Sequence, residues 1–147
     1  VRQVDAARER DEGEIITGGR APEGQNYGRG FFFLPTLITR VPQDSVLFSE
    51  EVFGPVLPIA TVTDLDEALE RANDSRYGLG ASVWTRSTDV IARVTRELEA
   101  GIVWVNQHLR TPPEVPFGGT KESGIGRENG RRALDEYTEE KTVLIRL

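Results

Sequence analysis

Cysteine and methionine are both absent from this chain of 147 residues, and histidine occurs only once, at His108. Without cysteine the chain has neither a disulfide framework nor a thiolate metal site, and it offers no thiol as a nucleophile. Glu114 is the only acidic residue close to His108 in the sequence, so we expect no metal site there. These absences exclude disulfide-stabilised scaffolds and the usual zinc-binding modules.

An excess of positive charge is also missing. The chain has 18 Lys and Arg residues against 24 Asp and Glu residues, a net charge of −6, whereas a nucleic-acid surface normally needs a basic patch. No apolar run approaches the roughly 20 residues of a membrane-spanning helix. Val1–Asp5 has no apolar core of the signal-peptide kind. These features predict a cytoplasmic protein that contacts neither nucleic acid nor a membrane.

The start of the chain resembles the interior of a helix. Val1, Val4 and Ala7 recur at helical spacing, and no N-cap residue precedes them. Combined with the lack of methionine, this pattern predicts a piece of a longer polypeptide, with ordinary removal of an initiator methionine as the alternative. The 147 residues have the length of one ordinary domain.

Apolar runs of strand length alternate with two amphipathic helices. One helix is expected to begin at Thr63 with a capping box and to bury Leu65, Ala68, Leu69 and Ala72. The other is expected over residues 87–100, stopped by Gly101. Strands are expected at residues 14–17, 31–41, 56–62, 80–85, 102–105 and 142–147.

Two tryptophans and one proline refine this pattern. Trp84 and Trp104 lie inside expected strands and are expected in the core. Pro35 interrupts the run at 31–41, which favours an edge strand or a bulge. Strand–helix–strand–helix–strand order with short connections predicts the α/β class, a layered parallel sheet with helices on both faces.

One short segment combines groups that suit a nucleotide ligand. In Glu51-Val52-Phe53-Gly54-Pro55, the carboxylate could accept two hydrogen bonds from the diol of a ribose, and the aromatic ring could stack on a planar heterocycle. Gly54-Pro55 predicts a turn that presents both side chains. On the residues alone the structural interpretation is favoured, because acids followed by an apolar and an aromatic residue before a turn commonly mark where a chain passes from the surface to the core.

A second segment, Pro116-Phe117-Gly118-Gly119-Thr120-Lys121-Glu122-Ser123-Gly124-Ile125-Gly126-Arg127-Glu128, is rich in glycine. Its glycines allow positive φ angles and close approach of other groups to the backbone. The spacing fits neither of the phosphate-binding glycine fingerprints, so we do not expect a phosphate loop.

Together these two segments resemble the aldehyde dehydrogenase superfamily. The resemblance extends to Arg71–Leu79, Ala100–Asn106 and Tyr137–Thr142 and covers nearly the whole chain. It implies that residues 1–147 are the C-terminal part of an aldehyde dehydrogenase catalytic domain, and that residues 142–147 are a terminal oligomerisation strand. A homo-oligomer is therefore expected.

The resemblance assigns roles to four side chains. It implies that Glu51 holds the nicotinamide ribose, that Phe53 contacts the nicotinamide, and that Phe117 lines the substrate tunnel. Glu128 corresponds to an acid on a proton path from the hydrolytic water. The alternatives are a core aromatic for Phe117 and, for Glu128, a carboxylate that fixes the loop or pairs with Arg127.

Two further polar residues follow the strand at 102–105. Asn106 lies where ligands bind in open α/β sheets, and the family has Val-Asn there. In the family this side chain more often stabilises the loop that carries the cysteine than contacts substrate. His108 could serve as a general base in isolation, but the resemblance implies no such role.

The resemblance implies an NAD(P)-dependent oxidation of an aldehyde to a carboxylic acid through a cysteine thiohemiacetal. In the family the cysteine, the water-activating glutamate, the oxyanion asparagine and the dinucleotide domain lie upstream, so this chain alone is expected to be inactive. Its partners would be an aldehyde and the remainder of the enzyme chain. The sequence does not distinguish NAD from NADP.

Other functions remain open at this stage. One is a non-catalytic aldehyde-dehydrogenase-like module for assembly or regulation, and another is an unrelated small α/β binding protein. For an enzyme, Glu114–Pro116 and Gly126–Gly130 are similar to betaine-aldehyde and aminoaldehyde dehydrogenases, although other branches share parts of them.

Overall fold

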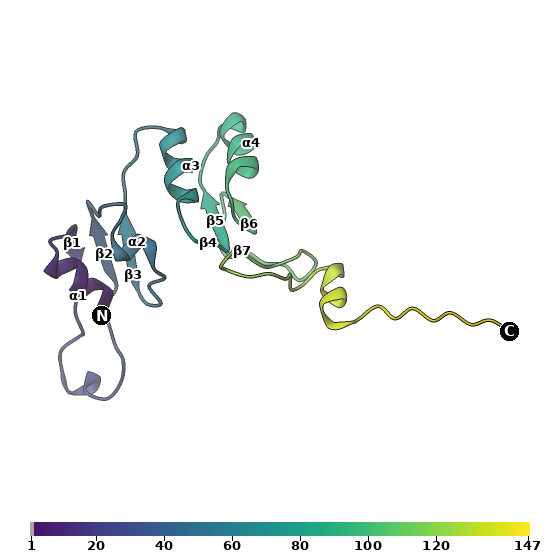
Figure 1. Cartoon of the computed structure of the whole chain (residues 1–147). Helices are drawn as coiled ribbons and strands as arrows, with labels where there is room; N and C mark the ends of the chain where they lie inside the picture. Colours follow the sequence, from purple (N-terminus) through teal and green to yellow (C-terminus); the bar gives the residue numbers. More distant parts are fainter. Residues whose placement is uncertain (1) are drawn as a thin grey trace. The chain divides into compact units, whose positions relative to one another are not determined.

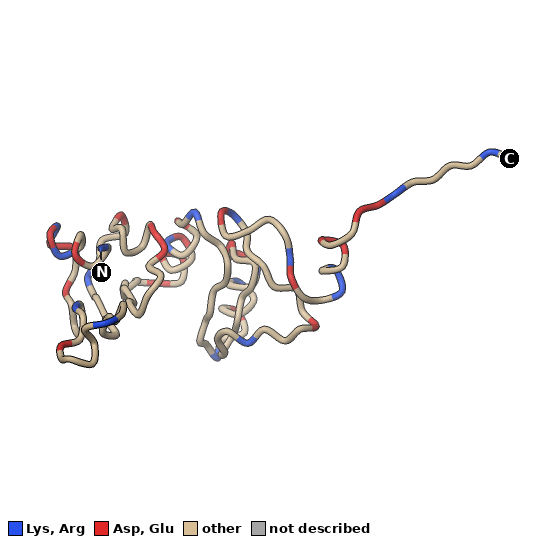
Figure 2. Tube along the Cα trace, turned by 90° about the horizontal axis from the view of Figure 1, so that it is seen from below, with Lys and Arg blue, Asp and Glu red and all other residues tan. Residues whose placement is uncertain are grey.

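The computed structural model describes residues 2–147, which divide into two compact units, one up to Ala68 and the other Leu69–Leu147. Val1, which the sequence pattern placed in the first helix, lies outside the described residues. Within the described part of the chain, no helix is long and apolar enough to cross a membrane. Residues of both charge signs are interspersed along the trace of each unit (Figure 2).

The first unit combines short helices with a three-stranded sheet (Figure 1). Its elements are α1 (Arg2–Glu9), β1 (Glu14–Thr17), the 3-10 turn η1 (Gln25–Tyr27), β2 (Thr36–Thr39), α2 (Val46–Ser49) and β3 (Val56–Ile59). The strand order is β1-β2-β3. β1 runs antiparallel to β2, whereas β3 runs parallel to it, with Thr36 opposite Val56 and Thr39 opposite Ile59.

The core of this unit is formed where both helices meet the central strand. α1 contributes Val4 and Ala7, β2 contributes Ile38, and α2 contributes Leu47, all of them buried. The helical spacing of Val4 and Ala7 explains why α1 packs with this face inward. Leu57 and Ile16 are more than half exposed, so the apolar side chains of the outer strands are not all covered within the unit.

Ser45 connects this core to a distant polar group. Its hydroxyl donates to Glu12 Oε2 at 2.6 Å and accepts from Leu47 N at 3.3 Å, so the same oxygen caps α2 and satisfies a carboxylate. Ser45 is fully buried. A single side chain therefore joins the start of α2 to the segment that follows α1.

Replacing Ser45 with alanine should lower the free energy of unfolding by about 1–3 kcal/mol, because the variant loses a helix cap and the hydroxyl that donates to Glu12 Oε2. Among the described residues, the Glu12 carboxylate would then keep only its 3.6 Å ion pair with Arg10. Thermal unfolding of the full-length gene product measures the effect. Ser49→Ala is the matched control, because Ser49 is an exposed residue of the same helix. Equal unfolding midpoints for the two variants would show that the Ser45 hydroxyl does not stabilise the unit.

The second unit holds the remaining strands. Its elements are α3 (Leu65–Asn73), which begins just before the division between the units, β4 (Tyr77–Gly78), β5 (Gly80–Val83), α4 (Thr88–Glu97), β6 (Ile102–Val105), β7 (Thr120–Lys121) and the 3-10 turn η2 (Arg131–Tyr137). β5 and β6 form a parallel pair connected through α4. β4 and β7 form a short antiparallel pair.

Both long helices of this part begin with side-chain caps. Ser87 Oγ accepts from Val90 N at 3.3 Å and starts α4. At α3 the cap is one residue later than the sequence pattern predicted. Asp64 Oδ1 accepts from Glu67 N at 2.9 Å, while the Glu67 carboxylate accepts from the Thr63 amide and hydroxyl, both at 2.8 Å. Thr63 therefore lies before the cap, since an acid accepts more strongly from a backbone N–H than a hydroxyl does.

The α/β class predicted from the sequence is confirmed, with corrections in the strand pairing. The runs at 56–62, 80–85 and 102–105 were expected side by side in one sheet. In the described residues β3, from the first of these runs, pairs with β2 instead. Of the three runs, only the two that form β5 and β6 pair with each other. Apolar patterns identify strands but carry no information on which distant strand supplies the hydrogen bonds.

The run at 31–41 was expected to be an edge strand or to contain a bulge. The edge position was wrong, whereas the pairing of β1 with β2 does have a register shift, between Ile15 and Thr17. β2 begins after Pro35 and lies in the centre of its sheet. The proline precedes the strand, so its missing N–H removes nothing from the ladder. The Pro58 ring is in β3, at an edge of the described sheet, where a missing donor costs least.

Of the two tryptophans predicted for the core, only one is there. Trp104 is 6% exposed and donates from Nε1 to the Arg110 carbonyl at 2.8 Å. Trp84 is 65% exposed, because it follows the last paired residue of β5 and is not held in the ladder. α4 ends at Glu97, so Gly101 does not stop the helix as predicted.

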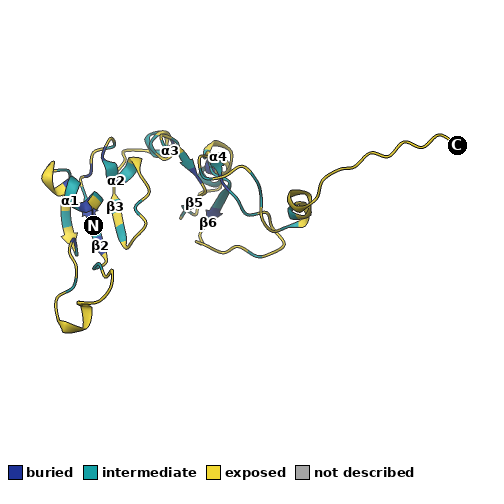
Figure 3. Ribbon diagram, turned by 60° about the horizontal axis from the view of Figure 1, so that its bottom comes forward, coloured by how far each residue is buried: buried dark blue, intermediate teal, exposed yellow. Residues whose placement is uncertain are grey.

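Residues 138–147 follow η2 as an exposed segment (Figure 3). No strand is assigned within residues 142–147, and Leu144 and Leu147 are among the most exposed apolar side chains of the described chain. A strand forms only when its backbone groups find a partner. The oligomerisation strand therefore stays a prediction, and its partner is absent from the described residues of this chain.

Candidate functional site

The loop between α2 and β3 presents the first pair of candidate residues. Glu51 is exposed, and the Phe53 ring is 96% exposed, whereas Val52 between them packs against the core of the first unit. Gly54 N donates to the Val52 carbonyl and Val56 N to the Gly54 carbonyl, both at 2.8 Å. The predicted turn is therefore present, and it directs the acid and the ring outward.

The exposure of Phe53 separates the two readings of this segment. If the segment only marked where the chain passes from the surface to the core, the Phe53 ring would be buried. Here the ring is exposed, and the neighbouring Val52 packs against the core instead. The backbone around Glu51 and Pro55 is anchored, because Gln3 Nε2 donates to the Glu51 carbonyl at 3.3 Å and Thr36 N donates to the Pro55 carbonyl at 2.8 Å. The loop backbone is thus anchored at both positions while the Glu51 and Phe53 side chains stay exposed.

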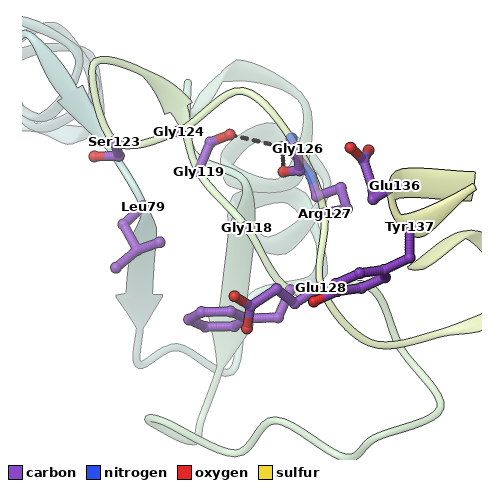
Figure 4. Close-up of a pocket in the computed structure, with 11 residues that line it drawn as sticks. Leu79, Gly118, Gly119, Ser123, Gly124, Gly126, Arg127, Glu128, Glu136 and Tyr137 are labelled. Carbon is purple, nitrogen blue, oxygen red and sulfur yellow. Dashed lines mark hydrogen bonds between the residues drawn. The ribbon is translucent and has the colours of Figure 1, made fainter. Parts of the chain in front are cut away.

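The second unit contains a pocket of about 310 Å³. Its walls come from the glycine-rich segment, from the residue before β5 and from the end of η2 (Figure 4). The lining residues are Leu79, Phe117, Gly118, Gly119, Ser123, Gly124, Gly126, Arg127, Glu128, Glu136 and Tyr137. The volume lies at the lower end of the range for small-molecule sites.

Phe117 and Glu128, predicted as site residues from the sequence, lie opposite each other in this pocket. Their backbones form a two-way bridge, with Phe117 N donating to the Glu128 carbonyl and Glu128 N to the Phe117 carbonyl, each at 2.7 Å. Phe117 is half-buried and Glu128 is exposed. The structure thus brings the ring and the carboxylate together although they are eleven positions apart in the sequence.

Arg127 fixes the glycine loop without help from Glu128. Its Nη1 donates to the carbonyls of Gly119 at 2.7 Å and Gly126 at 2.8 Å, as the dashed lines of Figure 4 show. Among the described residues, the Glu128 carboxylate has no ion pair with Arg127 and no hydrogen bond to the loop. The alternative in which Glu128 pairs with Arg127 or fixes the loop is therefore wrong, and the carboxylate is left available on the pocket wall.

Close approach explains most glycines of this segment better than positive φ does. Of Gly118, Gly119, Gly124 and Gly126, only Gly124 has a positive φ. A Cβ at Gly118 would meet the Gly126 carbonyl oxygen at 2.5 Å, and one at Gly119 would meet the Ser123 backbone carbonyl carbon at 2.9 Å. The loop folds back on itself so tightly that a side chain cannot be accommodated at these positions.

The Asn106 side chain bonds to backbone groups of this chain, and its predicted role toward a cysteine-carrying loop stays a prediction. Its side-chain oxygen accepts from Thr85 N and its amide nitrogen donates to the Thr85 carbonyl, both at 2.9 Å. These two bonds connect the carboxyl ends of β5 and β6. The residue has a positive φ of 55°, which asparagine tolerates better than most side chains.

His108 has a partner that the sequence did not indicate. Its Nδ1 lies 2.6 Å from Ser82 Oγ, and its ring lies 5.8 Å from the Trp104 ring, edge to face. In the described part of the chain no three His, Cys, Asp or Glu side chains form a cluster that could hold a metal ion. The histidine therefore links β5 to the loop after β6.

Part of the pocket wall comes from residues that the sequence pattern does not indicate. Glu136 and Tyr137 of η2 line the pocket but were not singled out as site residues. In the view of Figure 4, Glu136 lies beside Arg127, and the Tyr137 side chain extends toward Glu128. No local pattern distinguishes these two residues, since only the fold brings η2 against the glycine-rich segment.

Comparison with known proteins gives one consistent family. Residues 1–143 match the profile described as the aldehyde dehydrogenase family. The chain is 45% identical over 133 residues to a betaine aldehyde dehydrogenase of Brucella anthropi, which covers 90% of this chain and 27% of the relative. It is 46% identical over 137 residues to a phenylacetaldehyde dehydrogenase of Pseudomonas fluorescens, over 92% of this chain and 26% of the relative.

A solved structure shows the same similarity. It is that of a mutant of the P. syringae indole-3-acetaldehyde dehydrogenase AldA in complex with NAD+ and IAA. This chain aligns with it at a TM-score of 0.87 and 38% sequence identity, over 100% of this chain and 30% of that chain. The chain thus spans between a quarter and a third of the length of these proteins.

Proposed function

Because the chain belongs to the aldehyde dehydrogenase family, we propose that it is part of an enzyme that oxidises an aldehyde to a carboxylic acid with NAD+ or NADP+. The observation that carries the proposal is the pair of exposed family motifs. The loop after α2 presents Glu51 and Phe53, and a pocket of about 310 Å³ contains Phe117 and Glu128.

The residues of the loop fit one end of a dinucleotide. An outward carboxylate accepts hydrogen bonds from vicinal hydroxyls, and an exposed ring offers a flat apolar contact to a planar base. We assign Glu51 to the ribose next to the nicotinamide and Phe53 to the nicotinamide itself. When bound, the dinucleotide supplies a hydride acceptor. The contribution of Glu51 and Phe53 is to hold it in place, and correct placement of reacting groups accounts for a large part of catalysis.

The pocket residues fit the aldehyde side of the reaction. Phe117 contributes an apolar wall, and the Glu128 carboxylate is free to accept a proton from water. The proposed reaction also needs a thiolate nucleophile and a base that activates water. This sequence contains no cysteine, so we assign the nucleophile to a part of the protein outside these 147 residues.

The terminal segment fits a role in assembly. Val143, Ile145 and Leu147 alternate along an exposed extended segment that has no partner strand among the described residues. We propose that residues 142–147 pair with a strand of another subunit in a homo-oligomer. Pairing would satisfy the backbone and cover the apolar side chains at once.

The full-length gene product should reduce NAD+ or NADP+ in the presence of an aldehyde, and the isolated 147-residue chain should not. The reason is that the chain lacks the nucleophile that the proposed mechanism requires. The absorbance of the reduced nicotinamide measures turnover for a small panel of aliphatic, aromatic and cationic aldehydes.

Two outcomes would contradict this proposal. If the full-length product oxidises no aldehyde of the panel with either dinucleotide, the enzymatic function is wrong. Turnover by the isolated chain would instead refute the requirement for a nucleophile outside it. The lack of cysteine also leaves one alternative, a non-catalytic module for assembly or regulation, which a start codon directly before Val1 in the gene would favour.

A further inference from the structure

The ammonium group of Lys121 joins three segments of the second unit. Its Nζ donates to the backbone carbonyls of Asn73 at 2.7 Å and Ser75 at 2.9 Å. It also lies 2.7 Å from Glu99 Oε2. The three partners come from the end of α3, the turn after it and the segment before β6, so one cation satisfies carbonyls at a helix end and pairs with a carboxylate.

Neighbouring residues of β7 extend the same connection. The Thr120 hydroxyl lies within hydrogen-bond distance of the carbonyls of Gly78, at 3.2 Å, and Glu99, at 3.0 Å. Gly78 N donates to Ser123 Oγ at 3.0 Å. The two-residue strands β4 and β7 supply the remaining backbone pairing.

The Asn73 side chain connects the end of α3, which Lys121 contacts, to the segment at the end of α4. Its side-chain oxygen accepts from Glu99 N at 2.9 Å and its amide nitrogen donates to the Glu97 carbonyl at 2.7 Å. The end of α3 is thereby connected to the end of α4 independently of Lys121. The lysine contacts this connected region at Asn73, Ser75 and Glu99.

Polar contacts are the main restraint on the pocket wall. The wall formed by residues 117–128 contains four glycines and one buried residue, Gly119, so it has little apolar burial of its own. Phe117 lies four positions before Lys121, and Glu128 is bridged to Phe117. A shift of β7 would therefore move both pocket residues together.

We propose that Lys121 is a positioning residue, whose ammonium fixes residues 117–128 to the end of α3 and to Glu99 and so sets where Phe117 and Glu128 meet the aldehyde. The proposal rests on the proposed function and adds a residue that lines no part of the pocket. Misplacement of reacting groups by about 1 Å is enough to cost on the order of 100-fold in rate. Loss of the three contacts of the Lys121 ammonium should thus lower kcat/KM for the aldehyde more than it changes the KM for the dinucleotide.

Lys121→Met in the full-length gene product tests the proposal. Methionine keeps most of the length of the side chain and removes the charge and the hydrogen-bond donors of Nζ. We expect kcat/KM for the aldehyde to fall about 10- to 100-fold, with the KM for the dinucleotide changed less than about twofold. Lys141→Met is the matched control. Lys141 is the other lysine of the chain, is exposed, and has no described partner, so its replacement should change neither value.

Two further variants keep the test decisive if Lys121→Met folds poorly. Lys121→Arg retains the cation near Glu99, so it should recover part of the lost kcat/KM, although a planar guanidinium cannot reproduce all three contacts. Glu99→Gln removes the ion pair and leaves both carbonyl contacts of Nζ, so its effect on the aldehyde kcat/KM should be smaller than that of Lys121→Met.

Amide hydrogen exchange gives a readout that does not depend on activity. In Lys121→Met, exchange should accelerate in residues 117–128 and remain unchanged in α4 and β6. Uniform acceleration across the second unit, or kinetics equal to those of Lys141→Met, would overturn the proposal. If the wild-type product oxidises no aldehyde, the proposed function fails, and the exchange pattern alone still decides whether Lys121 holds this segment.

Discussion

Replacing Glu51 with glutamine in the full-length gene product should lower kcat/KM for the dinucleotide about 10- to 100-fold. A charged acceptor contributes about 1.5–3 kcal/mol to a hydrogen bond, and each 1.4 kcal/mol corresponds to a factor of ten. Glutamine keeps the size of the side chain but offers a single neutral oxygen to the two hydroxyls. Steady-state kinetics with varied dinucleotide, together with a direct binding titration, measures the change.

Glu50→Gln is the matched control for this experiment. Glu50 is the adjacent acid, is also exposed, and follows the last residue of α2, where its backbone N–H donates to the Val46 carbonyl. Its replacement should leave both kinetic constants within about twofold of the wild type, since surface charges contribute little. If Glu51→Gln proceeded at the wild-type rate with unaltered dinucleotide affinity, the assignment of Glu51 to the ribose would be refuted.

The second large effect is expected at a glycine outside both motifs. Gly101→Ala should destabilise the second unit by about 2–3 kcal/mol or prevent its folding, because overpacking at a tight contact has costs of this size. A Cβ at Gly101 would overlap the Gly118 carbonyl oxygen, and it would lie 3.1 Å from Gly119 Cα. Backbone atoms cannot move aside as a flexible side chain can. Thermal unfolding and soluble yield of the full-length product measure the loss.

Gly28→Ala serves as the control for the added methyl group. Gly28 has φ −69° and ψ −10°, and the atom nearest to a Cβ there is the Gln25 carbonyl oxygen at 3.7 Å. Alanine at such a site should leave the unfolding midpoint unchanged or raise it slightly. If Gly101→Ala unfolded at the same temperature as Gly28→Ala, the backbone at Gly118 would have to leave room for a Cβ at Gly101, which contradicts the overlap with the Gly118 carbonyl oxygen.

Several elements could be predicted from local sequence because local interactions decide them. The strands at 14–17 and 102–105 occur with the predicted bounds, since short apolar runs between turn residues leave the backbone few alternatives. Helix α3 was predicted with its cap one residue early, at Thr63 instead of Asp64. Both residues can cap a helix, so only the observed hydrogen bond distinguishes them.

The sequence by itself determined the family, the α/β class and the residue types that the two motifs supply, because these depend on local order along the chain. The tertiary structure decided which groups are available. It left Phe53 exposed and packed Val52 against the core. It also directed the Arg127 guanidinium to backbone carbonyls and left the Glu128 carboxylate on the pocket wall. Hydrogen bonds and burial join residues far apart in the chain, and no local pattern encodes which of several equivalent partners a group will meet.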